Sequence, residues 1–526
     1  MEPTPSATAA RTAPESAAST ATHTTNSVRR DAYADSVALM RAAQHLTGLA
    51  GIDAASLVMA TEPNLRLLAD AGLLTDEGSA ARPADLVVAL RGTVEAVEHA
   101  LDEVPALLDQ PAPDAQPGLG VGEMVPRALV EADPATSLAL ISTPGPYAAA
   151  EALKALRLGM HAFVFSDNVP LAQEIRIKQD AHRQGLLAMG PDCGTSLLDG
   201  LPLGFTNALR PGRIGLIGAS GTGLQQVSCL LDAAGEGVRQ MIGTGGRDLS
   251  AEVGARTTLD ALDLLDADPG CALIVLVSKP PAPDVAERVL ARAARADKPV
   301  VAAFLGPDRA ASRGRVTVVG TLRDAARAVL TALGATPLPA WTPPSVSPGR
   351  GRHVRALYAG GTFAYEARQL LPDAVTAVRP FAPGGDIAMP TRHLVLDLGD
   401  DAYTAGRPHP MIDPTVRAAH LRAALHDPNT AAVVLDVVLG HGAGPDPAAA
   451  LAAELDRVPA SERPPVLAFV VGTERDPQGT AAQRSRLAQA GAHLAPTSTD
   501  AAEWAVALIG SAVHGPVGTR DLTSTG

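Results

Sequence analysis

Short apolar runs alternate with longer amphipathic stretches along most of the chain, and glycine, proline and aspartate gather at the junctions. Such runs are typical of buried parallel strands, and the amphipathic stretches are typical of helices that cover a sheet. Breaks in this pattern predict a disordered tail at 1–29, a small N-terminal α/β domain at 30–110, a Rossmann-like domain at 120–205, a flavodoxin-like domain at 206–336, a proline-rich linker at 337–350 and a second flavodoxin-like domain at 351–515.

The last two domains repeat one pattern, so we expect two related five-stranded parallel sheets. The strands located in the first of them lie near Ile214 and at 239–242, 273–277 and 300–304. Those of the second lie at 356–358, 393–398, 432–438 and 466–470 and near His493. A ferredoxin-like arrangement is an option for the small N-terminal domain. The predicted fold class is therefore multi-domain α/β.

Two glycine-rich turns each join a predicted strand to a predicted helix. One precedes a helix from Leu224 to Ala234, and the other precedes a helix from Phe363 to Leu371. The first amides of a helix lack intrahelical partners and lie at the positive end of its dipole, and glycine lets an anion approach them. The phosphate-binding residues predicted at the two turns are Gly218, Ser220, Gly221, Thr222, Gly360, Gly361 and Thr362. We expect both turns to hold one anion between two helix ends.

Composition narrows the class of function. The formal net charge is -13, from 43 basic and 56 acidic residues, which disfavours nucleic acid as a partner. No apolar run is long enough to span a membrane. The three cysteines, Cys193, Cys229 and Cys271, show no metal-binding spacing, so a reducing compartment and a cytoplasmic location are expected.

Several segments resemble the α subunit of succinyl-CoA synthetase and the NDP-forming acyl-CoA synthetases. They are Met189-Gly-Pro-Asp-Cys-Gly194, the Pro-Gly-Arg-Ile strand at 209–215 and the turn at 218–222. Residues 242–248 fall at that family's Gly-Gly-Asp loop, which adds Gly245 and Gly246 to the predicted phosphate-binding residues. Residues 351–515 resemble the C-terminal domain of the β subunit through 359–362, 396–399 and 437–442. The resemblance implies that 120–205 is a CoA-binding-like domain, and that the two glycine turns are similar to the paired helices flanking the phosphohistidine in that family.

A narrower resemblance, to the FdrA family, covers about residues 30–515. The resemblance rests on the segments 31–40 and 58–64. Its most distinctive part is Asp397-Leu-Gly-Asp-Asp-Ala-Tyr-Thr-Ala-Gly-Arg-Pro-His-Pro-Met-Ile-Asp413. The resemblance implies a role in breakdown of purine-derived ureides such as allantoin. It also implies that the protein works with partner subunits as an oxamate (oxalurate) carbamoyltransferase.

The chain also departs from the synthetase pattern, and these differences bear on its chemistry as much as the matches do. No histidine occurs in 304–315, where that family has its catalytic histidine, and Ser278-Lys-Pro-Pro281 replaces the supporting glutamate. A phosphoenzyme relay needs an imidazole, and the chain has neither a Walker A pattern nor room for an ATP-grasp domain. With Arg309, Arg313 and Lys279 near the glycine turns, we instead expect the site to bind phosphate or carbamoyl phosphate.

Other polar positions are further candidates. Arg407 and His409 lie in an Arg-Pro-His-Pro loop after a strand, where they are expected to bind a substrate carboxylate or to lie at a subunit interface. Asp397, Asp400 and Asp401 are of a type that could bind a divalent ion, but helix capping is the commoner role, and no metal site is predicted. Cys193 is expected to pack and His441 to be an ordinary loop residue. The residues predicted to be catalytic are Arg309, Arg313, Arg407 and His409.

Three functions stay open. The intact glycine turns favour a component of a phosphate-dependent carbamoyl or acyl transferase, with a small carboxylate or amide substrate and partner subunits. The missing histidine favours a non-catalytic scaffold or CoA-binding sensor. The third option is an acyl-CoA synthetase component completed by a separate ATP-grasp subunit. Phosphate, carbamoyl phosphate and CoA are thus the candidate ligands.

Overall fold

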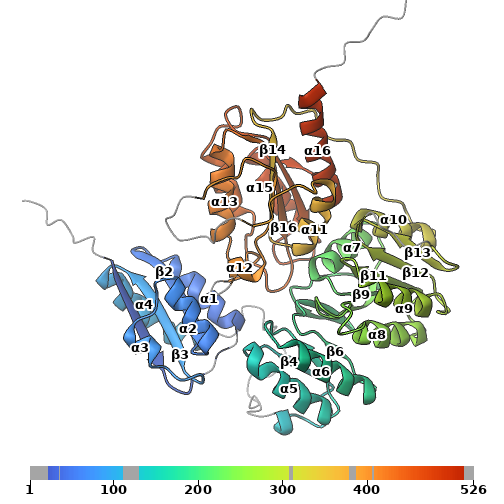
Figure 1. Cartoon of the computed structure of the whole chain (residues 1–526), viewed down its shortest axis with the longest axis horizontal. Coiled ribbons are helices and arrows are strands. Elements are labelled where there is room, and N and C mark those ends of the chain that lie inside the picture. The colour runs from blue at the N-terminus through green and yellow to red at the C-terminus, as the bar shows by residue number, and fades with distance from the viewer. Residues whose placement is uncertain are drawn as a thin grey trace, which may run out of the picture. The chain divides into compact units, whose positions relative to one another are not determined.

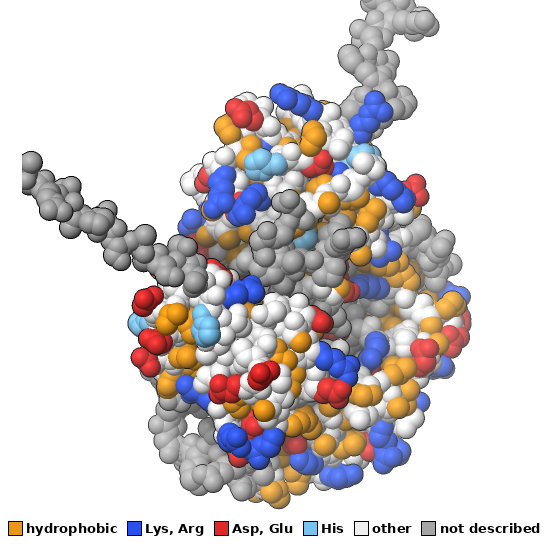
Figure 2. Space-filling view, turned by 60° about the vertical axis from the view of Figure 1, so that its left-hand side comes forward, with side chains coloured by type: hydrophobic (Ala, Val, Ile, Leu, Met, Phe, Trp, Pro, Cys, Tyr) orange, Lys and Arg blue, Asp and Glu red, His pale blue; other side chains and the backbone are white. Residues whose placement is uncertain are grey.

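The computed structural model describes residues 22–32, 34, 36–109, 129–306, 312–377, 387–404 and 408–514. The chain is a multi-domain α/β protein, as predicted (Figure 1). Its contacts divide it into two compact units, Met1–Ala34 with Ala42–Pro113, and Asp35–Arg41 with Asp114–Gly526. On the face shown in Figure 2, basic and acidic side chains are interspersed. No helix within the described ranges has the length and apolar character needed to cross a membrane.

The N-terminal part is built on one antiparallel sheet with strand order β1-β3-β2. Its apolar core includes Leu68, Val87 and Ala89, which are fully or almost fully buried. The elements, in chain order, are β1 (His23–Arg29), α1 (Ser36–Thr47), β2 (Ile52–Met59), α2 (Glu62–Asp70), α3 (Asp76–Ser79), β3 (Leu86–Gly92) and α4 (Val94–Asp109).

Strand β1 corrects the predicted disordered tail, which was expected to run to residue 29. The strand pairs with β3 along its whole length. Its Asn26 is buried, donates to the carbonyl of Leu73 at 2.7 Å and accepts from the amide of Thr75 at 2.8 Å. Because β1 is an edge strand, most of its side chains can be polar, so the apolar pattern does not reveal that it begins at His23. Residues 1–21 and 110–128 lie outside the described residues.

The second block is a small parallel sheet with strand order β4-β5-β6. Its elements are η1 (Leu129–Glu131), β4 (Leu138–Ile141), α5 (Gly145–Arg157), β5 (His161–Val164), α6 (Leu171–Arg183) and β6 (Ala188–Met189). The predicted domain boundary at 205/206 does not coincide with the end of this sheet. The hairpin of β7 (Thr195–Leu198) and β8 (Leu201–Gly204) extends the next sheet instead, because β7 pairs with β10.

The third block holds a seven-stranded sheet, ordered β13-β12-β11-β9-β10-β7-β8. Its five parallel strands have the 2-1-3-4-5 order of flavodoxin-like folds. The elements are β9 (Pro211–Gly218), α7 (Gly221–Ala233), β10 (Val238–Gly243), α8 (Arg256–Ala267), β11 (Leu273–Ser278), α9 (Pro283–Ala293), β12 (Val300–Phe304), β13 (Val316–Val319) and α10 (Leu322–Leu333). Strand β13, which is only four residues long, was not predicted from the sequence.

The fourth block repeats this order in a five-stranded parallel sheet, β15-β14-β16-β17-β18. Its elements are β14 (His353–Tyr358), α11 (Gly361–Leu370), β15 (Leu394–Asp397), α12 (Asp401–Thr404), α13 (Thr415–His426), β16 (Thr430–Val438), α14 (Ala449–Asp456), β17 (Val466–Val471), α15 (Thr480–Gln489), β18 (His493–Leu494) and α16 (Ser498–His514). The five predicted strands of this block therefore correspond to observed strands.

The third and fourth blocks are docked through shared apolar and polar contacts. One buried cluster contains Leu224 of α7 and Phe363 of α11. Asn207 donates to the carboxylate of Asp476 at 2.8 Å, and the backbone amide of His441 donates to the carbonyl of Thr206 at 2.9 Å. These contacts fix the start of α7 against the start of α11. They also give the His441 loop a structural role.

Candidate functional site

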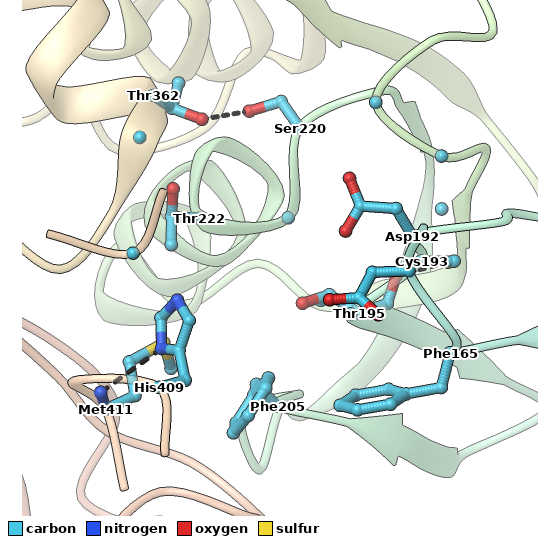
Figure 3. Close-up of a pocket in the computed structure, with 18 of the residues that line it drawn as sticks. Phe165, Asp192, Cys193, Thr195, Phe205, Ser220, Thr222, Thr362, His409 and Met411 are labelled. Atoms are coloured by element: carbon cyan, nitrogen blue, oxygen red, sulfur yellow. Dashed lines mark hydrogen bonds between the residues drawn. The ribbon is translucent and has the colours of Figure 1, made fainter. Parts of the chain in front are cut away.

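A cavity of about 400 Å³ lies where the second, third and fourth blocks meet (Figure 3). It is lined by the ends of β4, β5, β9, β11 and β14 and by the helix starts that follow β9 and β14. These strand ends are where doubly wound sheets bind ligands. The lining residues from the predicted phosphate-binding set are Gly218, Ser220, Gly221, Thr222, Gly245, Gly246, Gly361 and Thr362.

Helix α7 presents its first turn to this cavity. Ser220 is the N-cap, and its hydroxyl accepts from the amide of Gly223 at 3.2 Å. Among the described residues, no acceptor is found for the amides of Gly221 and Thr222, and the first turn carries no acidic side chain. Two free amides at the positive end of a helix are suited to an anion. Lys279, just after β11, lines the same cavity and adds positive charge.

Helix α11 begins against the same point. The hydroxyls of Ser220 and Thr362 are hydrogen-bonded at 2.6 Å, although 142 residues separate them (Figure 3). A side chain added at Gly360 would begin 2.9 Å from the hydroxyl of Thr222. The structure therefore brings the two glycine turns together.

A buried carboxylate, which was not predicted from the sequence, occupies part of the second glycine turn. Asp436, in the middle of β16, accepts from the amides of Ala359 and Gly360 at 2.9 Å each and pairs with the buried Arg417 at 2.9 Å. The amide of Gly360 is thus satisfied internally, and Gly360 does not line the cavity. This corrects the phosphate-binding role predicted for Gly360. The single acidic residue in the apolar run 431–438 was the signal that could have revealed it.

A second carboxylate, Asp397 at the end of β15, lines the cavity beside Gly361. A side chain on Gly361 would begin 2.3 Å from an oxygen of Asp397, so only glycine allows this approach. The amide of Gly399 donates to the other oxygen at 3.1 Å. Burial raises the pKa of Asp397 to about 6, while the positive charge of Lys279 opposes that rise. Asp397 therefore adds negative charge to the cavity only above about pH 6.

We expect this carboxyl to make anion binding depend on pH. Sulfate keeps its charge between pH 5 and pH 8, so it reports on the protein alone. Below pH 6 Asp397 is protonated and repels the anion less, so sulfate should bind about 10-fold more tightly at pH 5 than at pH 8. The free energy of this change is smaller than the ~4 kcal/mol by which two charges 4 Å apart interact near a protein surface. In Asp397→Asn, calorimetry should find most of this dependence gone. A variant that keeps the full dependence would assign it to another group.

The loop after β10 is held by a buried ionic network. Gly245 adopts a left-handed conformation (φ 86°), and a side chain there would begin 2.3 Å from the carbonyl of Pro191. Lys178 of α6 donates to the carbonyl of Thr244 at 2.7 Å and to Asp248 at 2.6 Å. These bonds join the second and third blocks. They hold Gly245 and its neighbour Gly246 at the cavity wall.

His409 is the predicted catalytic residue that the structure brings to the cavity. Its Nδ1 accepts from the amide of Met411 at 3.2 Å. Burial, followed by the charge of Arg417, lowers the pKa of His409 to about 4. Arg313 is exposed, pairs with Glu287 at 2.5 Å and does not line the cavity, which argues against its predicted catalytic role. Arg309 and Arg407 lie outside the described residues.

The remaining polar candidates have other roles in the structure. Burial raises the pKa of the Cys193 thiol to about 11, so it is packed and protonated at neutral pH, as expected. Asp400 accepts from the amide of Ala402 at 3.0 Å, which is a capping contact at the start of α12. No cluster suited to a metal ion occurs among the residues that the structure describes.

The comparisons with known proteins fit this architecture. Residues 357–508 match the CoA-ligase family model, and residues 22–122 match the model described as AllF, heavy metal-associated domain. The fourth block is thus a CoA-ligase domain. The segment 22–122 contains no cysteine, and its described residues offer no metal-binding cluster, so they do not fit a heavy-metal site.

Relatives define the family. The Escherichia coli (strain K12) protein YahF is 38% identical over 497 residues, which cover 90% of this chain and 96% of YahF. The chain therefore belongs to the YahF/FdrA family. Subunit alpha-2 of the Trichomonas vaginalis succinate–CoA ligase is 29% identical over 175 residues, which cover 32% of this chain and 55% of that subunit. One similar solved structure is the dinucleotide-forming acetyl-coenzyme A synthetase 1 of Ca. Korarchaeum cryptofilum in complex with phosphate and ADP. It is 17% identical, and the match covers 76% of this chain and 89% of that chain with a TM-score of 0.32.

Proposed function

We propose that the protein is a subunit of a phosphate-dependent carbamoyl or acyl transferase, of the oxamate carbamoyltransferase type, that acts in ureide catabolism in the cytoplasm. The observation that carries this proposal is the meeting of two glycine-rich helix starts at one cavity beside Lys279. Membership of the YahF/FdrA family and the match of 22–122 to the AllF model support it.

The roles proposed for individual residues follow from their positions. The amides of Gly221 and Thr222 bind the phosphate group, and Lys279 offsets its charge. The amides of Gly361 and Thr362 complete the site from the opposite helix. Fixed donors of this kind stabilise charge that develops during acyl transfer, and one of them is commonly worth about 3 kcal/mol of barrier. His409 contacts the transferred group.

A second candidate function is that of an acyl-CoA synthetase component served by a separate ATP-grasp subunit. The CoA-ligase match favours it, as does the extension of the cavity to Thr143 and Ser166 at the ends of β4 and β5. The absence of histidine from 304–315 opposes it. A non-catalytic CoA-binding scaffold is the third option, and it predicts CoA binding without phosphate binding.

Calorimetry on the purified chain separates these options. We expect phosphate and carbamoyl phosphate to bind in the micromolar to millimolar range. ATP should bind at least about 10-fold more weakly than phosphate, because the two helix starts form one phosphate-sized site and the sequence has no Walker A pattern. Binding of CoA alone would support the scaffold. Tight ATP binding without any response to phosphate or carbamoyl phosphate would refute the proposal.

A further inference from the structure

Three aromatic rings from different parts of the chain line the wall of the cavity opposite the helix ends. The rings of Phe165 and Phe205 have centroids 5.7 Å apart, and those of Phe205 and His409 are 5.8 Å apart. Figure 3 shows them in a row, facing Ser220, Thr222 and Thr362 across the cavity. Only 3% of the chain is Phe, Trp or Tyr, so two partly exposed phenyl rings beside an imidazole at one cavity form a distinct feature.

The tautomer of His409 follows from its hydrogen bond. Because Nδ1 accepts from the amide of Met411, the proton of the neutral ring lies on Nε2. Within the described part of the chain Nε2–H has no acceptor, and the ring edge away from Met411 points toward Thr222 (Figure 3). Burial keeps the imidazole uncharged at neutral pH. It is therefore a hydrogen-bond donor without a positive charge and without a free lone pair.

The size of the cavity leaves room beside an anion. Cavities of about 300–1,000 Å³ hold whole organic ligands, and this one measures about 400 Å³. A phosphate at the starts of α7 and α11 would occupy only the polar side. The aromatic side has flat apolar faces and one neutral N–H donor, which together suit a flat group with a carbonyl oxygen.

We propose that Phe165, Phe205 and His409 form a second subsite that binds a planar amide or ureide group attached to, or lying beside, the bound anion. His409 donates through Nε2–H to the carbonyl oxygen, and the ring of Phe205 packs on the flat face. This proposal rests on the proposed function, and it assigns the residues that would select the carbamoyl or amide part of the substrate.

Two stable phosphonates of similar size test this subsite. Phosphonoacetamide carries a planar amide, and isobutylphosphonate replaces that amide with an isopropyl group. By calorimetry the wild-type protein should bind phosphonoacetamide about 3- to 10-fold more tightly than isobutylphosphonate, the range of one net hydrogen bond. His409→Ala should remove this preference while the affinity for isobutylphosphonate stays within about 2-fold, and His409→Gln should restore it. The part of the preference that His409→Ala removes should be equal at pH 6 and pH 8, because a neutral ring donates at both.

Matched variants separate the subsite from general effects on folding. Phe205→Leu should weaken phosphonoacetamide binding, whereas Phe304→Leu, at a buried ring outside the cavity, and His426→Ala, at an exposed imidazole on α13, should not. Equal loss of both phosphonates in His409→Ala would overturn the subsite and place His409 in the anion site. Binding of phosphate with no preference for the amide would overturn the subsite alone. Failure of phosphate and both phosphonates to bind would overturn the proposed function as well.

Discussion

Replacing Asp436 with alanine should lower the free energy of unfolding of the fourth block by about 3–5 kcal/mol, the usual effect of leaving a buried charge without its partner. Asp436 is fully buried, and it accepts from the amides of Ala359 and Gly360 and from Arg417, which is also buried. Its removal leaves the buried guanidinium without a counter-charge and two amides without an acceptor. Asp436→Asn should lose less, because its amide oxygen still accepts one bond.

Hydrogen exchange at the amides of β14 and β16 is the suitable measurement, because a chain of several domains does not unfold in one step. Glu287→Ala is the control, because it breaks an exposed ion pair and should change stability by less than about 1 kcal/mol. Protection of β14 and β16 in Asp436→Ala equal to that of the wild type would show that the carboxylate does not hold this turn.

The repeated α/β pattern was sufficient to predict the architecture of the third and fourth blocks, because buried parallel strands are continuous apolar runs. It was insufficient at the sheet edges. Strand β1 is polar, and the hairpin of β7 and β8 lies between segments assigned to different domains. Local pattern does not show which sheet such a strand joins, since this depends on a partner far away in sequence, here β10.

The glycine turns could be found from the sequence because their anion-binding groups are backbone amides at helix starts. The spacing of the glycines indicates where the backbone forms such a turn. The side chains around them were harder to place. Arg313 pairs with Glu287 and does not line the cavity, and the carboxylate of Asp436 takes the amide of Gly360, one of those expected to bind phosphate. Lys279 of the third block and Asp397 of the fourth block meet at the cavity only because these two blocks dock. Sequence proximity carries no information about such docking.

Gly221→Val should weaken phosphate binding at least about 30-fold, which corresponds to the ~2 kcal/mol that a partly buried helix end contributes to a nearby charge. Gly221 is the first residue of α7, and side chains on a helix tilt toward its N-terminus. A valine there would project into the space in front of the free amides. Its Cβ would also lie 3.1 Å from the hydroxyl of Thr195, a close contact that a small shift can relieve, so the fold should survive.

Gly510→Val is the matched control for this change. Gly510 is an exposed helical glycine on α16, and a side chain there meets no atom within 4 Å. Phosphate affinity by calorimetry, with thermal melting to confirm folding, should fall in Gly221→Val and stay unchanged in Gly510→Val. Phosphate needs the amides of Gly221 and Thr222 at close range, because in the opposite turn the amides of Ala359 and Gly360 already donate to Asp436. Wild-type phosphate affinity in a folded Gly221→Val protein would reduce this turn to a strand–helix connection and remove the basis of the transfer mechanism.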